Sequence, residues 1–336
     1  MEEYKSVPIL TRILRSKAFL LLVLLVMLII VFTILAPFND GNFFKFTTLQ
    51  RALSDLAVPS CLAIGVGMLI VHGGIDLSAA KVGGLSAVVI AVGISTWMIP
   101  WWLALIIALA IALCVGFVNA FLINELRFMP FIATMAMSTV GDAVLRLIST
   151  TGAGVQRAVV NFRDDTIDAL NKVMIFGVTW SVVLVVILFI VYGIILSKTK
   201  FGRMMYFVGG NRMAARLAGI NARKISYILF MNTSLLASIG GFIYASRVKN
   251  GGLMTMINDQ FTGMTAAILG GISFGGGMGG LGGAFMGVLV LRTFNIGMVI
   301  IGANAYFTNI ASGALLLIAL SMDYFSQTRQ AKRLTA

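Results

Sequence analysis

The stretch KTKFGRMMYFVGGNRMAARLAGINARK, residues 198–224, separates two long apolar parts of the chain. It carries seven Lys or Arg residues and no Asp or Glu, with six candidate membrane spans before it and four after it. Loops with an excess of Lys and Arg remain on the cytoplasmic side of a membrane. The stretch therefore predicts an all-α integral membrane protein and places this loop in the cytoplasm.

The centre of this loop predicts one short helix. Asn211 is a good helix N-cap and Gly219 supplies the left-handed residue that closes a helix, so about two turns fit between them. Met213 and Leu217, four residues apart, share one face of that helix. A capped helix on a basic loop favours a docking element for a soluble partner. The alternative is a loop that is basic only because it stays in the cytoplasm.

Composition supports one membrane domain over residues 1–336, with the membrane-spanning part at 17–324. The chain is 59% hydrophobic and 11% charged, with a mean hydropathy of +1.00, whereas soluble domains carry about 25% charged residues. The net charge of +13 does not indicate nucleic-acid binding, because the charges lie between spans. Most Lys and Arg residues fall in segments assigned to the cytoplasm, which favours an even number of spans and cytoplasmic termini.

Apolar runs predict about ten spans. These are residues 18–36, 51–71, 77–95, 102–123, 130–149, 178–197, 225–245, 261–273, 284–301 and 305–323. The eighth is short, because about 13 residues at ~1.5 Å each do not cross a core of about 30 Å. We expect it to be re-entrant or broken. The longer outer segments are 150–177 and 246–260, and a further outer loop passes through Pro37, Asn39 and Gly41.

Two glycine-rich motifs interrupt the apolar pattern. The first is Gly73-Gly74-Ile75-Asp76-Leu77-Ser78, and the second is GGISFGGGMGGL at 270–281. Both read GGI with GGL nine or ten residues later, a weak internal repeat. The first motif fits either a tight turn with a capping Asp76 or a broken helix that lines a substrate path. The second also fits close packing of helices through small residues.

Several polar side chains lie inside predicted spans: Asn119, Asp142, Asn232, Arg292, Asn295 and Asn309. Arg292 lies deep in its span and needs a partner or a wet cavity. Asp142 lies deep in another span, and we expect a buried ion pair between the two. The alternatives for Arg292 are pairing with Asp76 or a snorkelled position near lipid.

The sequence offers little for metal or cofactor chemistry. The single histidine, His72, lies next to a glycine pair and fits a structural role at a helix end. Cys61 and Cys114 both lie in spans, so no disulfide framework or metal cluster is indicated. No phosphate-binding G-x-x-x-x-G-K-[ST] motif occurs. We therefore expect a chain that is not an enzyme, with no metal and no cofactor of its own.

Five segments resemble one known family, the permease subunits of bacterial ABC importers for monosaccharides, and the ribose and galactose/methyl-galactoside types above all. They are LIVHGGIDLSAAKVGGLSAVV (69–89), NELRFMPFIATMAMSTV (124–140), TKFGRMMYFVGGNRMAARLAGIN (199–221), ILGGISFGGGMGG (268–280) and FNIGM (294–298). The similarity extends from about residue 45 to near the end. The chain departs from the family pattern at Ala79, Lys81 and Arg292.

The resemblance implies the ABC importer permease fold in a bacterial cytoplasmic (inner) membrane, embedded in the lipid bilayer. It implies a partner ATP-binding cassette subunit that holds ATP and Mg, an extracytoplasmic solute-binding protein, and a second permease copy, identical or a close paralogue. The solute would be a monosaccharide of the galactose/glucose or ribose type.

Two sets of site residues follow from these interpretations. Residues expected to couple to the ATPase are Asn211, Arg212, Arg216, Leu217 and Gly219. Residues expected along the substrate path are Gly73, Gly74, Asp76, Ser78, Asn119 and Asn295. The binding protein is expected on outer segments 150–177 and 246–260.

Other functions remain open at this point. A nucleoside or autoinducer ABC permease would carry the same motifs. An ion-coupled secondary transporter would need a deep carboxylate such as Asp142. A membrane scaffold without transport has no use for opened backbone, so the glycine-rich breaks argue against it.

Overall fold

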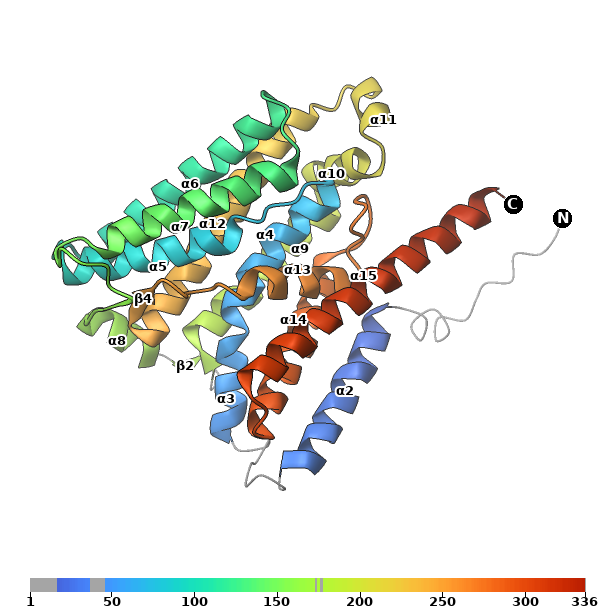
Figure 1. The fold of residues 1–336 in the computed structure, drawn as a ribbon. Coiled ribbons are helices and arrows are strands. Elements are labelled where there is room, and N and C mark those ends of the chain that lie inside the picture. The colour runs from blue at the N-terminus through green and yellow to red at the C-terminus, as the bar shows by residue number, and fades with distance from the viewer. Residues whose placement is uncertain (1–16, 37–45, 173, 176–177, 336) are drawn as a thin grey trace.

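The computed structural model describes residues 17–36, 46–172, 174–175 and 178–335 (Figure 1). The basic N-terminal segment before residue 17 and the outer loop through Pro37, Asn39 and Gly41 lie outside the described residues.

Each of the ten predicted spans contains a helix. In chain order the helices are α2 (Lys17–Leu35), α3 (Phe46–Asp55), α4 (Ala57–His72), α5 (Ala79–Ser95), α6 (Trp101–Asn124), α7 (Pro130–Ser149), α9 (Trp180–Lys198), α12 (Ala222–Val248), α13 (Asp259–Leu269), α14 (Leu281–Ile300) and α15 (Ala305–Thr335). Within the described residues, six helices are long and apolar enough to cross a membrane. The structure is therefore that of an all-α membrane protein, while the number of crossings and the side of each terminus stay predictions.

Helix α4 forms the centre of the molecule. In the span Ala52–His72, 94% of the most apolar stretch is buried, and α4 packs against α9, α10, α12, α13 and α14. Small residues make this packing close: a Cβ atom on Gly65 would lie 3.0 Å from Cα of Thr233. The Thr233 hydroxyl also donates to the carbonyl oxygen of Gly65 at 3.1 Å. The helix is apolar on all sides because every side faces protein.

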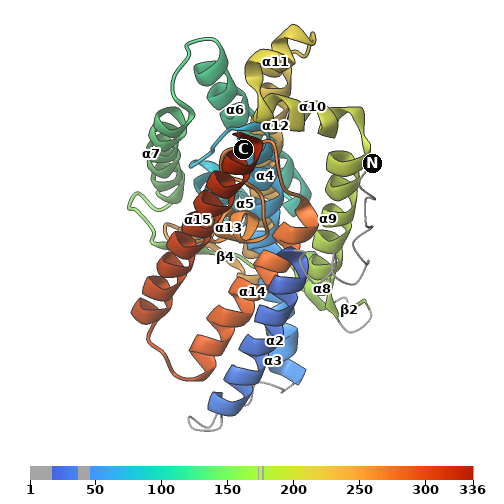
Figure 2. The same cartoon turned by 90° about the vertical axis from the view of Figure 1, so that its right-hand side faces the viewer.

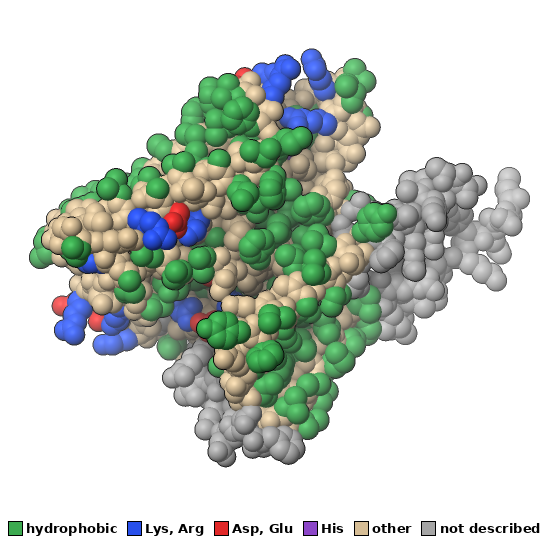
Figure 3. Space-filling model, viewed as in Figure 1, with side chains coloured by type: hydrophobic (Ala, Val, Ile, Leu, Met, Phe, Trp, Pro, Cys, Tyr) green, Lys and Arg blue, Asp and Glu red, His purple; other side chains and the backbone are tan. Residues whose placement is uncertain are grey.

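The outer helices have the opposite character. Only 28% of the apolar stretch of α6 and 22% of those of α7 and α9 are buried. Their exposed side chains are large and hydrophobic, among them Phe117, Ile132 and Ile190. Hydrophobic side chains accordingly cover much of the surface in Figure 3. These helices expose the kind of surface that lipid tails cover.

The short elements lie at the two ends of the helical body (Figure 1). At one end are α8 (Asp165–Lys172), the strand β1 (Val159–Asn161) paired with β4 (Asn250–Gly252), and the strand β2 (Met174–Ile175) paired with β3 (Val178–Thr179). At the other end are α10 (Lys200–Gly210) and α11 (Arg212–Leu217). Helix α12 begins beside α11 and ends beside β4, so it runs between the two ends.

Two boundaries differ from the predicted spans. The second span is broken at Leu56, because Pro59 has no N–H to donate to the carbonyl of Asp55 and its ring crowds that carbonyl. The eighth span contains only the 11-residue helix α13, about 16 Å long. It ends at Leu269 because Gly270 and Gly271 follow, and Gly271 has a φ of 94°. The expected shortness of this span is confirmed.

Candidate functional site

The basic loop folds into two helices, of which the sequence predicted one. Asn211 caps α11 as expected: its Oδ1 accepts hydrogen bonds from the backbone N–H groups of Met213 at 3.0 Å and Ala214 at 2.9 Å. The helix preceding it, α10, was missed. Its signal was Thr199, whose hydroxyl oxygen accepts from the N–H of Gly202 at 3.1 Å and so caps α10.

Gly219 closes α11 as predicted. Its φ is 76°, a left-handed conformation that costs glycine little. The N–H of Gly219 donates to the carbonyl of Arg216, and the N–H of Ile220 donates to that of Ala215, both at 3.0 Å. The last carbonyls of the helix are thereby satisfied.

The outward face of α11 is both apolar and basic. Met213 is 66% exposed and Leu217 is 84% exposed, and Arg212 and Arg216 are exposed beside them. Figure 3 shows Lys and Arg side chains gathered over this tip next to hydrophobic ones. The opposite side holds the helix in place, because Ala215 is buried. The docking role expected of this face stays a prediction.

Helix α10 joins this tip to the core through what we call the glycine junction, formed by Gly73, Gly209, Gly276 and Gly277. A Cβ atom at Gly209 would overlap the carbonyl oxygen of Val71, the second-last residue of α4. The N–H of Gly277 donates to the same carbonyl at 2.8 Å. Backbone therefore contacts backbone where α4, α10 and the second glycine motif meet, which only glycine permits.

Tyr206 ties α10 to the same turn. Its hydroxyl donates to the carbonyl oxygen of Gly279 at 2.5 Å. Burial raises the pKa of Tyr206 above its ordinary value, which favours the neutral phenol that donates this bond. Helix α11, α10 and the turn before α14 are thus connected by direct contacts.

The first glycine motif is a locked turn. The N–H and the hydroxyl of Ser78 both donate to Oδ1 of Asp76, at 2.8 and 2.6 Å. The amide of Asn119, on α6, donates to the Ser78 hydroxyl at 2.8 Å. From α13, Gln260 donates to the carbonyl of Asp76 at 2.7 Å and accepts from the N–H of Ala80 at 2.8 Å. Sequence reasoning missed Gln260, because nothing local to it indicates a partner 184 residues away.

The residues predicted along the substrate path fall into three groups. Asp76, Ser78 and Asn119 are brought together but are buried, and they line neither of the two cavities described here. Gly73 belongs to the glycine junction, and the N–H of Gly74 donates to the carbonyl of Leu69 at 2.9 Å. Asn295 lines a cavity. In this structure the first motif is therefore a structural turn, and its role in a path stays a prediction.

The predicted ion pair between Asp142 and Arg292 is wrong. Asp142 is held by Lys81 at 2.5 Å and by Arg146 at 2.7 Å. Arg292 contacts Asp259 at 2.6 Å, so neither alternative given for it applies. The reason is helix adjacency: α7 packs on α5 and α6, whereas α14 packs on α2, α4 and α13.

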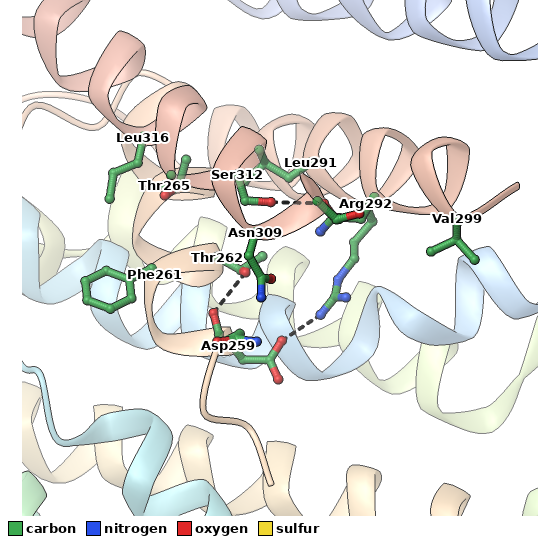
Figure 4. Close-up of a pocket in the computed structure, with 14 residues that line it drawn as sticks. Asp259, Phe261, Thr262, Thr265, Leu291, Arg292, Val299, Asn309, Ser312 and Leu316 are labelled. Atoms are coloured by element: carbon green, nitrogen blue, oxygen red, sulfur yellow. Dashed lines mark hydrogen bonds and ion pairs between the residues drawn. The ribbon is translucent and has the colours of Figure 1, made fainter. Parts of the chain in front are cut away.

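Arg292 lies in a cavity of about 410 Å³ between α13, α14 and α15 (Figure 4). Most of its fourteen lining residues carry polar side chains: Asn258, Asp259, Thr262, Thr265, Arg292, Asn295, Thr308, Asn309 and Ser312. A second hollow of about 480 Å³ lies between α5, α7, α13 and α15, and is mainly apolar. Helices α7 and α15 run along the same face of the molecule in Figure 2.

The two segments that the sequence assigns to the outside, 150–177 and 246–260, form one surface. Strands β1 and β4 pair antiparallel, with Val160 opposite Gly251. Lys249 contacts Asp168 at 2.6 Å, and the amide of Asn171 donates to the carbonyl of Ser246. Residues from 150–177 and 246–260 therefore lie side by side, although about 90 positions separate them in the chain.

Comparison with known proteins places these features in a family. The family model described as "Branched-chain amino acid transport system / permease component" matches residues 48–320. This chain belongs to that permease family. No solved structure matches it.

Relatives of this permease are named for sugars. It is 30% identical over 299 residues to the ribose import permease protein RbsC of Bacillus subtilis, covering 89% of this chain and 90% of the relative. It is 32% identical over 317 residues to the L-arabinose transport system permease protein AraH of Escherichia coli, covering 93% and 92%. It is 27% identical over 311 residues to the galactose/methyl galactoside import permease protein MglC of Haemophilus influenzae, covering 89% and 92%. The resemblance drawn from the sequence is confirmed, and the chain is a multi-pass transport subunit.

Proposed function

We propose that this permease is the transmembrane subunit of an ATP-binding cassette importer and translocates a monosaccharide of the galactose/glucose or ribose type. The observation that carries the proposal is α11, an exposed apolar and basic helix that α10 connects to the glycine junction. Such a helix offers a contact surface to a soluble ATPase. Because α10 contacts α4 and the turn before α14, a displacement of α11 would be transmitted to both helices.

The energy source is a partner subunit. The chain has no phosphate-binding motif, so ATP and Mg would be held by the ATPase. Closure of the ATPase on ATP would move α11, and rigid-body rocking of the spans would follow. Asn211 and Gly219 fix the geometry of α11, while Arg212, Arg216 and Leu217 supply the contact surface.

The outer surface built by β1 and β4 suits a solute-binding protein. It joins both segments assigned to that partner, and it lies at the opposite end from α11. A second permease copy, identical or a close paralogue, would complete the pore. A bacterial cytoplasmic membrane is the location that fits this assembly.

The sugar is proposed from the relatives' names together with the polar side chains that line the cavity around Arg292. A nucleoside or an autoinducer remains the alternative solute. An ion-coupled secondary transporter is disfavoured, because Asp142 is occupied by Lys81 and Arg146 and is not free to bind a coupling cation.

The test is reconstitution with and without the ATPase subunit. Vesicles that contain the complex and its binding protein should accumulate one of D-ribose, D-galactose, L-arabinose or D-fructose. They should do so only when ATP is supplied on the side of the membrane where the ATPase subunit lies. Replacing Arg216 by Ala together with Gly219 by Val should leave membrane insertion intact and uncouple ATP hydrolysis from uptake. Uptake without the ATPase, or normal coupling in this variant, would contradict the proposal.

A further inference from the structure

We propose that the cavity between α13, α14 and α15 is a binding site for a neutral polyhydroxylated solute. Its polar contacts would be the Asp259–Arg292 pair and the side-chain amides of Asn295 and Asn309. The proposal rests on the import function above and names where on this chain the solute is held.

The cavity has the size and the chemistry of a small-molecule site. Its volume of about 410 Å³ falls within the range of about 300–1,000 Å³ typical of ligand pockets. Polar side chains from three helices converge on it, beside the apolar side chains of Phe261, Leu291, Val299 and Leu316. A sugar presents hydroxyl groups and apolar C–H faces together, so a site of mixed polarity suits it.

Arg292 is not fully used by its protein partner. Its Nη2 contacts Oδ1 of Asp259, while its Nε has no hydrogen-bond partner among the described residues. The two side chains remain 21% and 18% exposed, so part of each faces the cavity. Nε itself is enclosed, so a solute with oxygen acceptors would use the Nη N–H groups that Asp259 leaves free.

Two amides extend this polar surface. Asn295 Oδ1 accepts from the hydroxyl of Ser312 at 3.1 Å, which leaves its NH₂ group as a donor. Asn309, from α15, points toward the Asp259–Arg292 pair in Figure 4. Donors and acceptors thus lie side by side, which suits the neighbouring hydroxyl groups of a sugar, each both donor and acceptor.

The charge of the site selects against ions. The charges of Asp259 and Arg292 cancel. The attraction of a bound anion to the arginine is therefore offset by its repulsion from the aspartate, and the reverse holds for a cation. A neutral solute meets no such conflict. Phe261 supplies an aromatic wall to both this cavity and the apolar hollow. A sugar ring can place its C–H face against such a wall.

The first experiment measures occupancy by thiol protection, with no ATPase present. Ser312→Cys is made in a Cys114→Ser background, since Cys114 is exposed and Cys61 is buried. A small water-soluble methanethiosulfonate should label Ser312→Cys. The sugar that the complex imports, at ten times its Kd, should slow labelling about tenfold. Ile310→Cys, 68% exposed and outside the cavity, is the control and should show no protection.

The second experiment measures transport. Asn295→Ala and Asn309→Ala should each raise KM for the imported sugar about two- to tenfold, the effect of one lost hydrogen bond, with little change in the amount of protein in the membrane. Ile310→Ala should leave KM unchanged. Thermal unfolding of each variant separates a change in KM from a loss of folding.

The outcomes separate this site from the proposed function. ATP-dependent uptake with no protection at Ser312→Cys and unchanged KM in both Asn variants would overturn the site and leave the importer standing. Absence of ATP-dependent uptake of any of the four sugars would overturn the monosaccharide function, and the sugar site with it. Protection confined to Ser312→Cys together with raised KM would support both.

Discussion

At the scale of single residues, two cations inside the helical body each have a carboxylate partner. Arg292 meets Asp259, and Lys81 meets Asp142. Lys81 and Arg292 are also two of the positions at which the chain departs from the family pattern that it resembles. Each departure is therefore accompanied by a carboxylate that accommodates it.

Arg292→Leu should destabilise the folded protein by about 3 kcal/mol, because it leaves Asp259 partly buried without its partner. Asp259→Leu combined with Arg292→Leu removes both charges and should recover most of that loss. Denaturant unfolding in detergent measures both variants. A single variant as stable as the natural chain would show that the contact contributes nothing to folding.

Asn211→Ala should weaken α11 by about 1 kcal/mol, the usual cost of losing an N-cap. Hydrogen exchange at the amides of Met213 and Ala214 should accelerate, since both donate to Asn211. Asn211→Asp retains an acceptor oxygen and serves as the control. Unchanged exchange in Asn211→Ala would mean that the cap is not what orders this helix.

Local chemistry at this scale was predictable, and partners distant in the chain were not. The hydrogen bonds of the Asn211 side chain and of the Gly219 N–H reach residues at most three positions away in the chain. The local sequence alone therefore indicates their roles. The partner of Arg292 lies 33 residues away, and its identity depends on which helices are neighbours. That adjacency is decided by the packing of whole helices, which a pattern of single residues does not encode.

At the scale of elements, the glycine junction requires glycine at position 209 but leaves room for a side chain at position 210. A Cβ atom at Gly209 would overlap the backbone of Val71, whereas a Cβ atom at Gly210 would meet nothing within 4 Å. The two adjacent residues therefore form a matched pair for testing the connection between α10 and α4.

Gly209→Ala should displace α10 from α4 at a cost of about 1–3 kcal/mol and should reduce the sugar transported per ATP hydrolysed. Gly210→Ala should leave both stability and coupling near their natural values. The measurement is the ratio of uptake to ATP hydrolysis in reconstituted vesicles. Equal ratios in the two variants would show that coupling does not pass through this contact.

Element positions were largely predictable because a span requires a long apolar run. The exceptions have local causes: Pro59 divides the second span, and paired glycines end α13 early. Helix α10 was missed because Gly209 and Gly210 indicate a break. In the structure Gly209 and Gly210 are the last two residues of α10, and Thr199 caps its first turn.

At the scale of the whole molecule, the face that carries α7 and α15 is hollowed. The apolar hollow between α7 and α15 opens there, and α7 packs only against α5 and α6 among the principal helix contacts. Asp142 lies between Lys81 and Arg146, and Figure 3 shows an acidic side chain between basic ones over α7. Partly exposed charges at this place would suit a wet pore wall if the proposed second copy packs on this face.

Met135→Cys, exposed on α7 and lining the hollow, should form cross-linked dimers with a bifunctional thiol reagent. Ile187→Cys, 50% exposed on α9, should not, because α9 lies away from this face. Both are made without Cys114, and gel electrophoresis gives the readout. Dimers from Ile187→Cys and none from Met135→Cys would place the second copy elsewhere.

The pairing of β1 with β4 has a mechanical consequence for how the two sides of the membrane communicate. Strand β4 begins two residues after α12 ends, and α12 begins three residues after Gly219 closes α11. Helix α12, one unbroken helix of 27 residues and about 40 Å long, therefore connects the paired strands β1 and β4 to α11. The proposed binding protein would contact the first end and the proposed ATPase the second. If the proposed partners bind at these two ends, a displacement at β4 would reach α11 along the backbone of α12 alone.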